Sequence, residues 1–308
     1  MGYLFLFISI ISGSIKGFFA KKISNKTSGT ESAVFSNLIR MLLCILIGFL
    51  FVCLEGNGAD LLICTELLAI SALAGVSTAA FIVSWLLAVK RSALTSTDAF
   101  ISMGILMPII LSFVFYGETV SLSQILGICL LMLAVIIMSA YNYQIKQKMD
   151  AVSIILLLLV GASNGLTDFA YKMYQYNKND TPASVFNFYI YVFSTVVLFS
   201  VFFILHFIGK KRAGKGSDDR KVQDKLFDKQ KTVYIAIMAI FLFSHSYFKT
   251  LAASRLPAIQ IYPLSQAASM IFALLMSAAF FKEKIKPLCI IGLGLMFCAL
   301  MLINVIRF

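Results

Sequence analysis

Long apolar segments separated by short polar stretches follow one another along the whole chain. Ten segments stand out, at residues 2–20, 33–53, 63–88, 94–116, 121–141, 152–173, 182–207, 232–253, 257–281 and 285–306. An α-helix needs about 20 mostly apolar residues to cross a bilayer, and these segments are close to that length. Most connections are short, so we expect consecutive helices to be antiparallel neighbours. The pattern predicts an all-α integral membrane protein with ten transmembrane helices.

Composition and charge agree with a chain that is solvated by lipid. Hydrophobic residues make up 60% of the sequence and charged residues 13%, whereas a soluble domain is roughly half apolar and a quarter charged. The net charge of +12 would suggest nucleic acid in a soluble protein, but here the basic residues lie between apolar segments. We therefore expect membrane lipids as partners and no nucleic acid. The cysteines and histidines lack metal-site spacing, so we expect no metal and no cofactor.

The distribution of basic residues predicts the orientation in the membrane. The loops after the first, third, fifth, seventh and ninth segments carry nineteen Lys and Arg, and the other side carries four. Cytoplasmic loops are the ones enriched in Lys and Arg. The odd-numbered loops are therefore expected in the cytoplasm, with both termini outside. The long loop 208–231 holds nine Lys and Arg with four Asp, which indicates a solvated loop, with a regulatory or partner site as the alternative.

The sequence also aligns with itself. A shift of 165 residues superimposes segments three to five on segments eight to ten, and a shift of 151 superimposes the first two on the sixth and seventh. The matched pairs include Leu86 with Leu251, Ser112 with Ser277, Glu118 with Glu283, Gly127 with Gly292, Ser12 with Ser163, and Lys21 with Lys172. We infer a first five-helix repeat at 1–141, a linker at 142–151 and a second repeat at 152–308 that contains the basic loop.

Five helices in each repeat have a topological consequence. Because five is odd, the second repeat must enter the membrane inverted. The loop around Glu118 lacks Lys and Arg, whereas the loop around Glu283 has three Lys, as expected for loops on opposite sides. Inverted repeats are common in secondary transporters, which bind substrate near the midplane between the repeats. The repeats would then exchange conformations to give alternating access.

Several short motifs resemble those of the drug/metabolite transporter superfamily, specifically its EamA type. They are Leu106-Met107-Pro108, Phe115-Tyr116-Gly117-Glu118 with Gly127, and in the second copy Phe281-Lys282-Glu283 with Gly292. Arg40 also lies where this family often has an arginine. The sequence departs from the family at Ser12-Gly13, where many members have Trp-Gly, and at Ala273, which falls opposite Pro108. The resemblance implies a secondary transporter, often an exporter, of amino acids, metabolites, drugs or sugar derivatives.

Two opposite charges lie at matched depths in the two repeats. Lys16 matches Thr167 under the 151-residue shift and is thus one position from the match of Asp168. An ionisable group costs about 2.5–3.5 kcal/mol in the middle of a spanning helix, so it usually faces a cavity or a partner. We expect Lys16 and Asp168 to line the transport pathway, with the first and sixth helices facing each other. A purely structural salt bridge is the alternative.

Three further side chains are candidates for the pathway. Asp98 lies one turn inside the fourth segment and could instead cap that helix. Arg40 could extend toward the cytoplasm or bind a carboxylate. Trp85 fits the aromatic belt of the membrane interface or could stack on a ligand.

The remaining candidates lie on the eighth and ninth segments. Tyr262 and Gln266 are four residues apart and share a helix face. His245 shares a face with Lys249, and we expect Lys249 and Lys172 to lie near the outer surface.

Helix breakers in the fourth and ninth segments predict walls of a cavity. Gly104 and Pro108 could interrupt the fourth helix, and Pro263 removes a backbone donor from the ninth. Irregular backbone at membrane depth is tolerated where it is buried or lines a cavity. A kink that serves only packing is the alternative.

The leading functional hypothesis is a secondary transporter of a small polar metabolite, amino acid or drug-like solute. No GxxxxGK[ST] loop for ATP is present, so coupling to protons or to a counter-substrate are the open choices. A flippase for a lipid or lipid-linked sugar is one alternative. A membrane-embedded lipid-modifying enzyme is another, although HExxH and acidic metal-binding runs are lacking. We expect no enzymatic activity and a bacterial plasma membrane location. The sequence leaves the oligomeric state open.

Overall fold

The computed structural model describes residues 1–24, 29–55, 61, 63–91, 100–141, 150–177, 181–212, 229–281 and 287–304. Over these residues the chain is helical and forms no strand. The helices are α1 (Gly2–Ser24), α2 (Thr30–Leu54), α3 (Thr65–Arg91), α5 (Leu106–Tyr116), α6 (Leu122–Tyr141), α7 (Ala151–Asn177), α8 (Ala183–Arg212), α10 (Lys229–Ala253), α11 (Ala258–Phe281) and α12 (Pro287–Asn304). Each corresponds to one predicted apolar segment, so the predicted fold class is confirmed.

Several helices extend beyond their apolar segments. α8 continues to Arg212 and α10 begins at Lys229, so both flanks of the predicted loop 208–231 are helical and that prediction is wrong at its ends. Continuing the helix satisfies backbone hydrogen bonds where the chain leaves the hydrocarbon. Lys231 is buried in the first turn of α10 and donates to Ser32 Oγ at 3.0 Å. Residues 213–228 lie outside the described part of the chain.

The surface of the bundle is apolar and its interior holds polar groups. By length and composition, α1, α2, α3, α7, α8 and α10 can each cross a membrane, and three shorter apolar helices lie at Phe100–Tyr116, Leu122–Ile137 and Ile290–Ile303. Large side chains such as Leu46, Phe49 and Phe207 are exposed, while Asp168 and Lys172 are buried. This distribution is that of an integral membrane protein, because lipid and not water surrounds the exposed apolar side chains.

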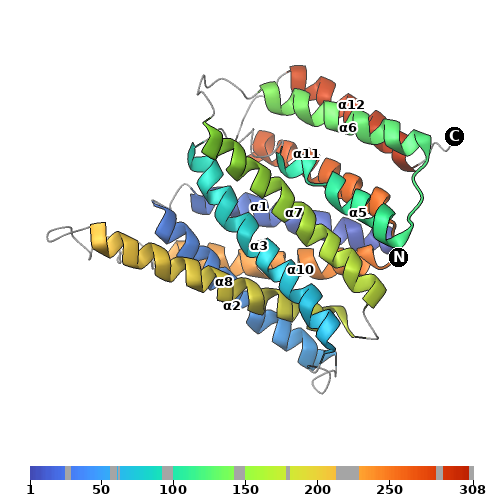
Figure 1. Cartoon of the computed structure of the whole chain (residues 1–308). Coiled ribbons are helices and arrows are strands. Elements are labelled where there is room, and N and C mark those ends of the chain that lie inside the picture. The colour runs from blue at the N-terminus through green and yellow to red at the C-terminus, as the bar shows by residue number, and fades with distance from the viewer. Residues whose placement is uncertain are drawn as a thin grey trace.

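The helices of the two halves interdigitate about an approximate two-fold relation. α1 packs along α10, and its counterpart α7 packs along α3, the counterpart of α10. α2 lies against α8, and α6 lies against α12, so each of these pairs joins equivalent helices of the two halves (Figure 1). Most of the helix packing therefore joins one half of the chain to the other.

A turn interrupts the fourth apolar segment at Gly104 and Ile105, just before α5. In a continuous helix the carbonyl of Gly104 would accept from residue 108, but Pro108 has no N–H. The amide of Met107 donates to that carbonyl instead, at 3.1 Å. The turn packs tightly on α7: a Cβ added to Gly104 would lie 2.3 Å from the carbonyl oxygen of Gly161.

Candidate functional site

A pocket of about 200 Å³ lies between the ends of four helices. It is lined by the last turns of α1 and α3 and the first turns of α2 and α10. The lining residues are Ala20, Ile23, Gly29, Ala33, Ser36, Asn37, Arg40, Trp85, Leu86, Val89, Ile235 and Met238. Drug-sized ligands occupy pockets of roughly 300–1,000 Å³, so this pocket suits a smaller solute.

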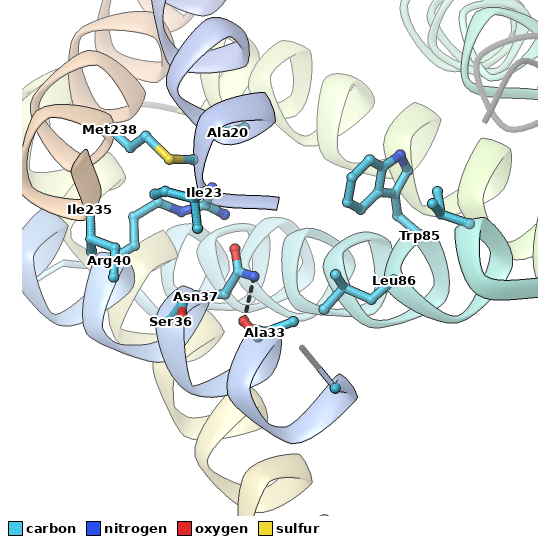
Figure 2. A pocket seen from close by; sticks show the side chains of 12 residues that line it. Ala20, Ile23, Ala33, Ser36, Asn37, Arg40, Trp85, Leu86, Ile235 and Met238 are labelled. Atoms are coloured by element: carbon cyan, nitrogen blue, oxygen red, sulfur yellow. Dashed lines mark hydrogen bonds between the residues drawn. The ribbon is translucent and has the colours of Figure 1, made fainter. Parts of the chain in front are cut away.

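Among the described residues that line the pocket, only Arg40 has a charged side chain. It shares a face of α2 with Ser36 and Asn37, and Figure 2 shows all three on one side of the pocket. Arg40 Nε is buried without a hydrogen-bond partner. The side-chain amide nitrogen of Asn37, in contrast, has a partner: it donates to the carbonyl oxygen of Ala33 at 2.8 Å. The guanidinium forms no ion pair with any residue that the structure describes.

Trp85 forms the opposite side of the pocket, on α3 (Figure 2). Its ring packs against the small apolar cluster of Ala88, Leu157 and Val160, which joins α3 to α7. The tryptophan therefore presents a flat apolar wall that is held by the packing of two long helices. This position of Trp85 agrees with both predicted roles, an anchor at the membrane interface and a contact to a ligand.

Lys16 lies deeper along α1 than the lining residues of that helix. It precedes Ala20 by one turn and Ile23 by two, so the three share a face. Lys16 is partly accessible and lies within electrostatic range of Arg40. Within the described residues, its ammonium group has no hydrogen-bond or ion-pair partner. We therefore place Lys16 at the inner end of the space that Arg40 lines.

Asp168 pairs with Lys249 and not with Lys16. Lys249 Nζ lies 2.6 Å from Asp168 Oδ1, and both residues are buried. Tyr262 donates its hydroxyl to the backbone carbonyl of Asp168 at 2.5 Å, and its ring lies 5.6 Å from Lys249 Nζ. The expected position of Lys249 near the outer surface is wrong, because the carboxylate of α7 holds its ammonium group inside the bundle.

His245 and Gln266 hold helices together. His245 Nδ1 lies 2.9 Å from the carbonyl oxygen of Ser9, and the Ser9 hydroxyl donates to the carbonyl of His245 at 2.9 Å. A carbonyl only accepts, so Nδ1 carries the proton. The close approach of α1 and α10 at this point depends on Gly13, because an added Cβ would lie 2.9 Å from His245 Nδ1. Gln266 Nε2 donates to Ser102 Oγ at 2.8 Å, which ties α11 to the turn before α5.

The predicted helix breakers lie elsewhere than at this pocket. Gly104 lines a separate apolar hollow of about 390 Å³ with Met107 and Gly161. Pro108 is buried in α5, and Pro263 is buried in α11. α11 continues through Pro263, so the expected break there is wrong; the proline only removes the donor that would pair with the carbonyl of Ile259. Asp98 lies outside the described residues.

A second charged cluster ties the opposite ends of the helices. Lys172 of α7 lies 2.8 Å from Glu118 Oε1 and donates to the carbonyl of Leu256 at 2.8 Å. Glu118 Oε2 accepts from the amide of Ala258, the first residue of α11, at 2.7 Å. Lys172 is 1% exposed, so it lies at the expected end of the bundle but is covered by the residues around it. The repeat motif indicates Glu118 in the sequence, but no sequence pattern predicts Lys172 as its partner.

A third polar contact closes the same end of the bundle. Glu55, just after α2, accepts a hydrogen bond from the hydroxyl of Tyr247 on α10 at 2.7 Å and one from the hydroxyl of Ser184 on α8 at 2.5 Å. Tyr174 at the end of α7 donates to the carbonyl of Thr181 at 2.6 Å. On the side away from the pocket, these contacts and the Glu118–Lys172 pair join α7, α8, α10 and α11 to the segments that follow α2 and α5.

The described residues form ten helices in two interdigitated halves, with buried charges and a pocket at one end, an architecture common among membrane transporters. The model of the EamA-like transporter family matches residues 1–140 and again 151–305. The chain belongs to the EamA-like transporter family, within the drug/metabolite transporter superfamily. The members of this family are transporters and not enzymes.

Solved structures show the same fold. One, whose title gives only the crystal structure of a protein, superposes with a TM-score of 0.73 at 12% sequence identity. The match covers 98% of this chain and 96% of that chain. At this identity the likeness concerns the fold alone. No curated protein matches the sequence.

Proposed function

We propose that the protein is a secondary transporter that exports or exchanges a small polar metabolite, amino acid or drug-like solute by alternating access. The observation that carries this proposal is the asymmetry between the two ends of the bundle. One end contains the pocket beside Arg40, and the other is tied by Glu118 with Lys172 and by Glu55 with Tyr247. A solute site that opens at one end while the other is sealed is what alternating access requires.

The pocket opens on the side that the charge distribution assigns to the cytoplasm. Its lining comes from helix ends beside the first, third and seventh loops, which belong to the basic set. In this proposal the pocket faces the cytoplasm, and the tied helix ends face the outside. In the alternate conformation the Glu118–Lys172 and Glu55–Tyr247 contacts would separate, and the helix ends around Arg40 would close.

Coupling to protons or to a counter-substrate would drive the cycle. Asp168 is the candidate for the coupling residue, since its buried carboxylate pairs with Lys249 of α10 and its backbone carbonyl accepts from Tyr262 of α11. If Asp168 were protonated, the attraction to Lys249 would be lost and α7 and α10 could move apart. Exchange of two solutes needs no such step, and then Asp168 would hold the helices together throughout the cycle.

Transport in proteoliposomes tests the proposal. Vesicles loaded with a mixed metabolite panel would be read by mass spectrometry for wild type, Asp168→Asn and empty liposomes. Arg255→Gln is a matched control, because Arg255 is an exposed basic residue at the end away from the pocket. Saturable loss of one solute class with wild type and with Arg255→Gln supports the proposal. Loss of no solute, together with movement of a labelled lipid, would favour a flippase.

A further inference from the structure

We propose that the pocket binds a small organic oxyanion, with Arg40 and Lys16 holding its carboxylate or phosphate group and Trp85 lying beside its apolar part. This inference rests on the proposed transport function and specifies the substrate class of the same site. It is argued from the charge balance inside the bundle, from the state of the Arg40 guanidinium and from the lining of the pocket.

Among the described residues, the charge balance around the pocket is positive. Asp168 is the acidic residue within electrostatic range of Lys16, and Lys249 already pairs with it at 2.6 Å. The described residues that line the pocket include neither Asp nor Glu. Lys16 and Arg40 therefore lie at membrane depth as two like charges without a counter-ion among the described residues. A charge at membrane depth usually has a partner or faces a cavity, and an anionic substrate would supply that partner.

The Arg40 guanidinium is open for a bidentate ligand. Its Nε is buried without a hydrogen-bond partner, and the remaining nitrogens form no hydrogen bond to any described residue. The planar fork of an arginine matches the two oxygens of a carboxylate or phosphate. A ligand of this kind would satisfy the Nε donor that the protein itself leaves unpaired. Ser36, on the same face of α2, could add a hydroxyl donor.

Snorkelling to the membrane surface does not account for Arg40. The residue lies ten positions after Thr30, the first residue of α2, which corresponds to about 15 Å along a helix. Its buried Nε shows that the side chain stays inside the bundle. Lys16 lies farther from the end of α1 at Ser24 than the lining residue Ala20 does. Both cations thus lie inside the bundle, where a substrate passes.

The other residues that line the pocket indicate the chemical character of the rest of the substrate. Trp85, Leu86, Val89, Ile235 and Met238 make most of the wall apolar. A volume of about 200 Å³ admits a small molecule. An inorganic ion alone would leave this apolar wall uncovered, so an oxyanion that carries a compact apolar or aromatic body is the better match.

Trp85 provides a direct measure of occupancy, because it is the only tryptophan in the chain. Its fluorescence in detergent-purified protein would be titrated with four probes of similar size: phenylacetate, phenyl phosphate, phenylacetamide and phenethylammonium. The first two differ in the acidic group, and the last two replace it by a neutral and a cationic group. The variants are Lys16→Gln, Arg40→Gln and Arg40→Lys, with Arg255→Gln as the control.

We expect at least one of the two anions to bind about tenfold or more tightly than the amide and the cation. A hydrogen bond between charged groups adds about 1.5–3 kcal/mol, which corresponds to this difference in affinity. Lys16→Gln and Arg40→Gln should each weaken the anion about tenfold or more, and Arg40→Lys should weaken it less. Comparison of phenylacetate with phenyl phosphate then assigns the carboxylate or the phosphate. Arg255→Gln should bind as wild type does.

Other outcomes overturn the inference. Equal binding of the amide or the cation, unchanged anion binding in both Gln variants, or no response to any probe would each reject an oxyanion site. Thermal melting of each variant separates loss of binding from loss of fold, and Arg40→Lys retains the charge if Arg40→Gln fails to fold. Anion binding without transport in proteoliposomes would contradict the transport function alone. Transport of a neutral or cationic solute would contradict the oxyanion site alone.

Discussion

Lys249 of α10 donates a hydrogen bond of 2.6 Å to the carboxylate of Asp168 on α7, inside the bundle. α7 is the first helix of the second repeat, and α10 is packed against both α7 and α1. The pair neutralises the one acidic residue, among those the structure describes, within electrostatic range of Lys16. It therefore stabilises the contact between α7 and α10 and at the same time leaves a positive charge on α1 beside the pocket.

The first prediction concerns the stability of this pair. Asp168→Asn and Lys249→Met should each lower the stability of the protein by about 3–5 kcal/mol, because each leaves one buried charge without its partner. The double variant should be closer to wild type than either single variant, because it removes both charges. Thermal melting of the four proteins in one detergent measures the effect. Additive losses in the double variant would show that the two side chains do not stabilise each other.

The second prediction concerns the contact that seals the end away from the pocket. Glu118→Gln weakens the bond to Lys172 and should raise the population of the state open on that side about tenfold, since a hydrogen bond to a charged group contributes about 1.5–3 kcal/mol. Ala253, whose carbonyl oxygen accepts from Lys172, is a buried reporter position. In a background with the native cysteines replaced by serine, Ala253→Cys should react faster with an impermeant maleimide when Glu118→Gln is present.

The control for this experiment is Glu66→Gln, which removes an acidic group in the first turn of α3 at the same end of the bundle. It should leave the reaction rate of Ala253→Cys unchanged. Equal rates with and without Glu118→Gln would show that the Glu118–Lys172 pair does not limit access from that side.

The third prediction concerns the close packing of the turn before α5 on α7. Gly104→Ala should destabilise the protein by about 1–3 kcal/mol, as overpacking of an interior does, because its Cβ would lie 2.3 Å from the carbonyl oxygen of Gly161. Gly294→Ala in α12 is the matched control, since nothing lies within 4 Å of its added Cβ. It should be neutral or stabilising by up to about 1 kcal/mol. Equal melting temperatures for the two variants would contradict the packing.

Hydropathy and self-similarity were sufficient to predict the fold. The ten helices follow from the length of the apolar segments, and the inverted halves follow from pairs such as Glu118 with Glu283. The interruption at Gly104 also followed a local rule, because Pro108 lacks the donor that a continuous helix would need. These features depend on residues close together in the sequence.

The partners of the buried charges could not be predicted in the same way. Periodicity gives the face of a helix on which Asp168 lies, but it does not give the helix that this face meets. The repeat placed Lys16 opposite Asp168, whereas packing brought Lys249 there from α10. Lys172 likewise has the sequence position of a surface lysine, but in the structure it contacts Glu118 and the loop after α10. Arg40 and Trp85 were both candidates, yet only packing places them in one pocket.

The last prediction tests which side of the membrane the pocket faces. Cys53 ends α2 on its exposed face, and Cys64 lies exposed just before α3, so both flank the second loop, away from the pocket. If the odd-numbered loops are cytoplasmic, an impermeant maleimide should label these thiols in intact cells. Cys44 is buried and should not react, and Cys129 and Cys298 face lipid, where a thiol is rarely ionised. The double variant Cys53→Ser/Cys64→Ser should lose the label. Labelling that depends on Cys53 and Cys64 and appears only after the cells are permeabilised would invert the orientation, and the pocket beside Arg40 would then face the outside.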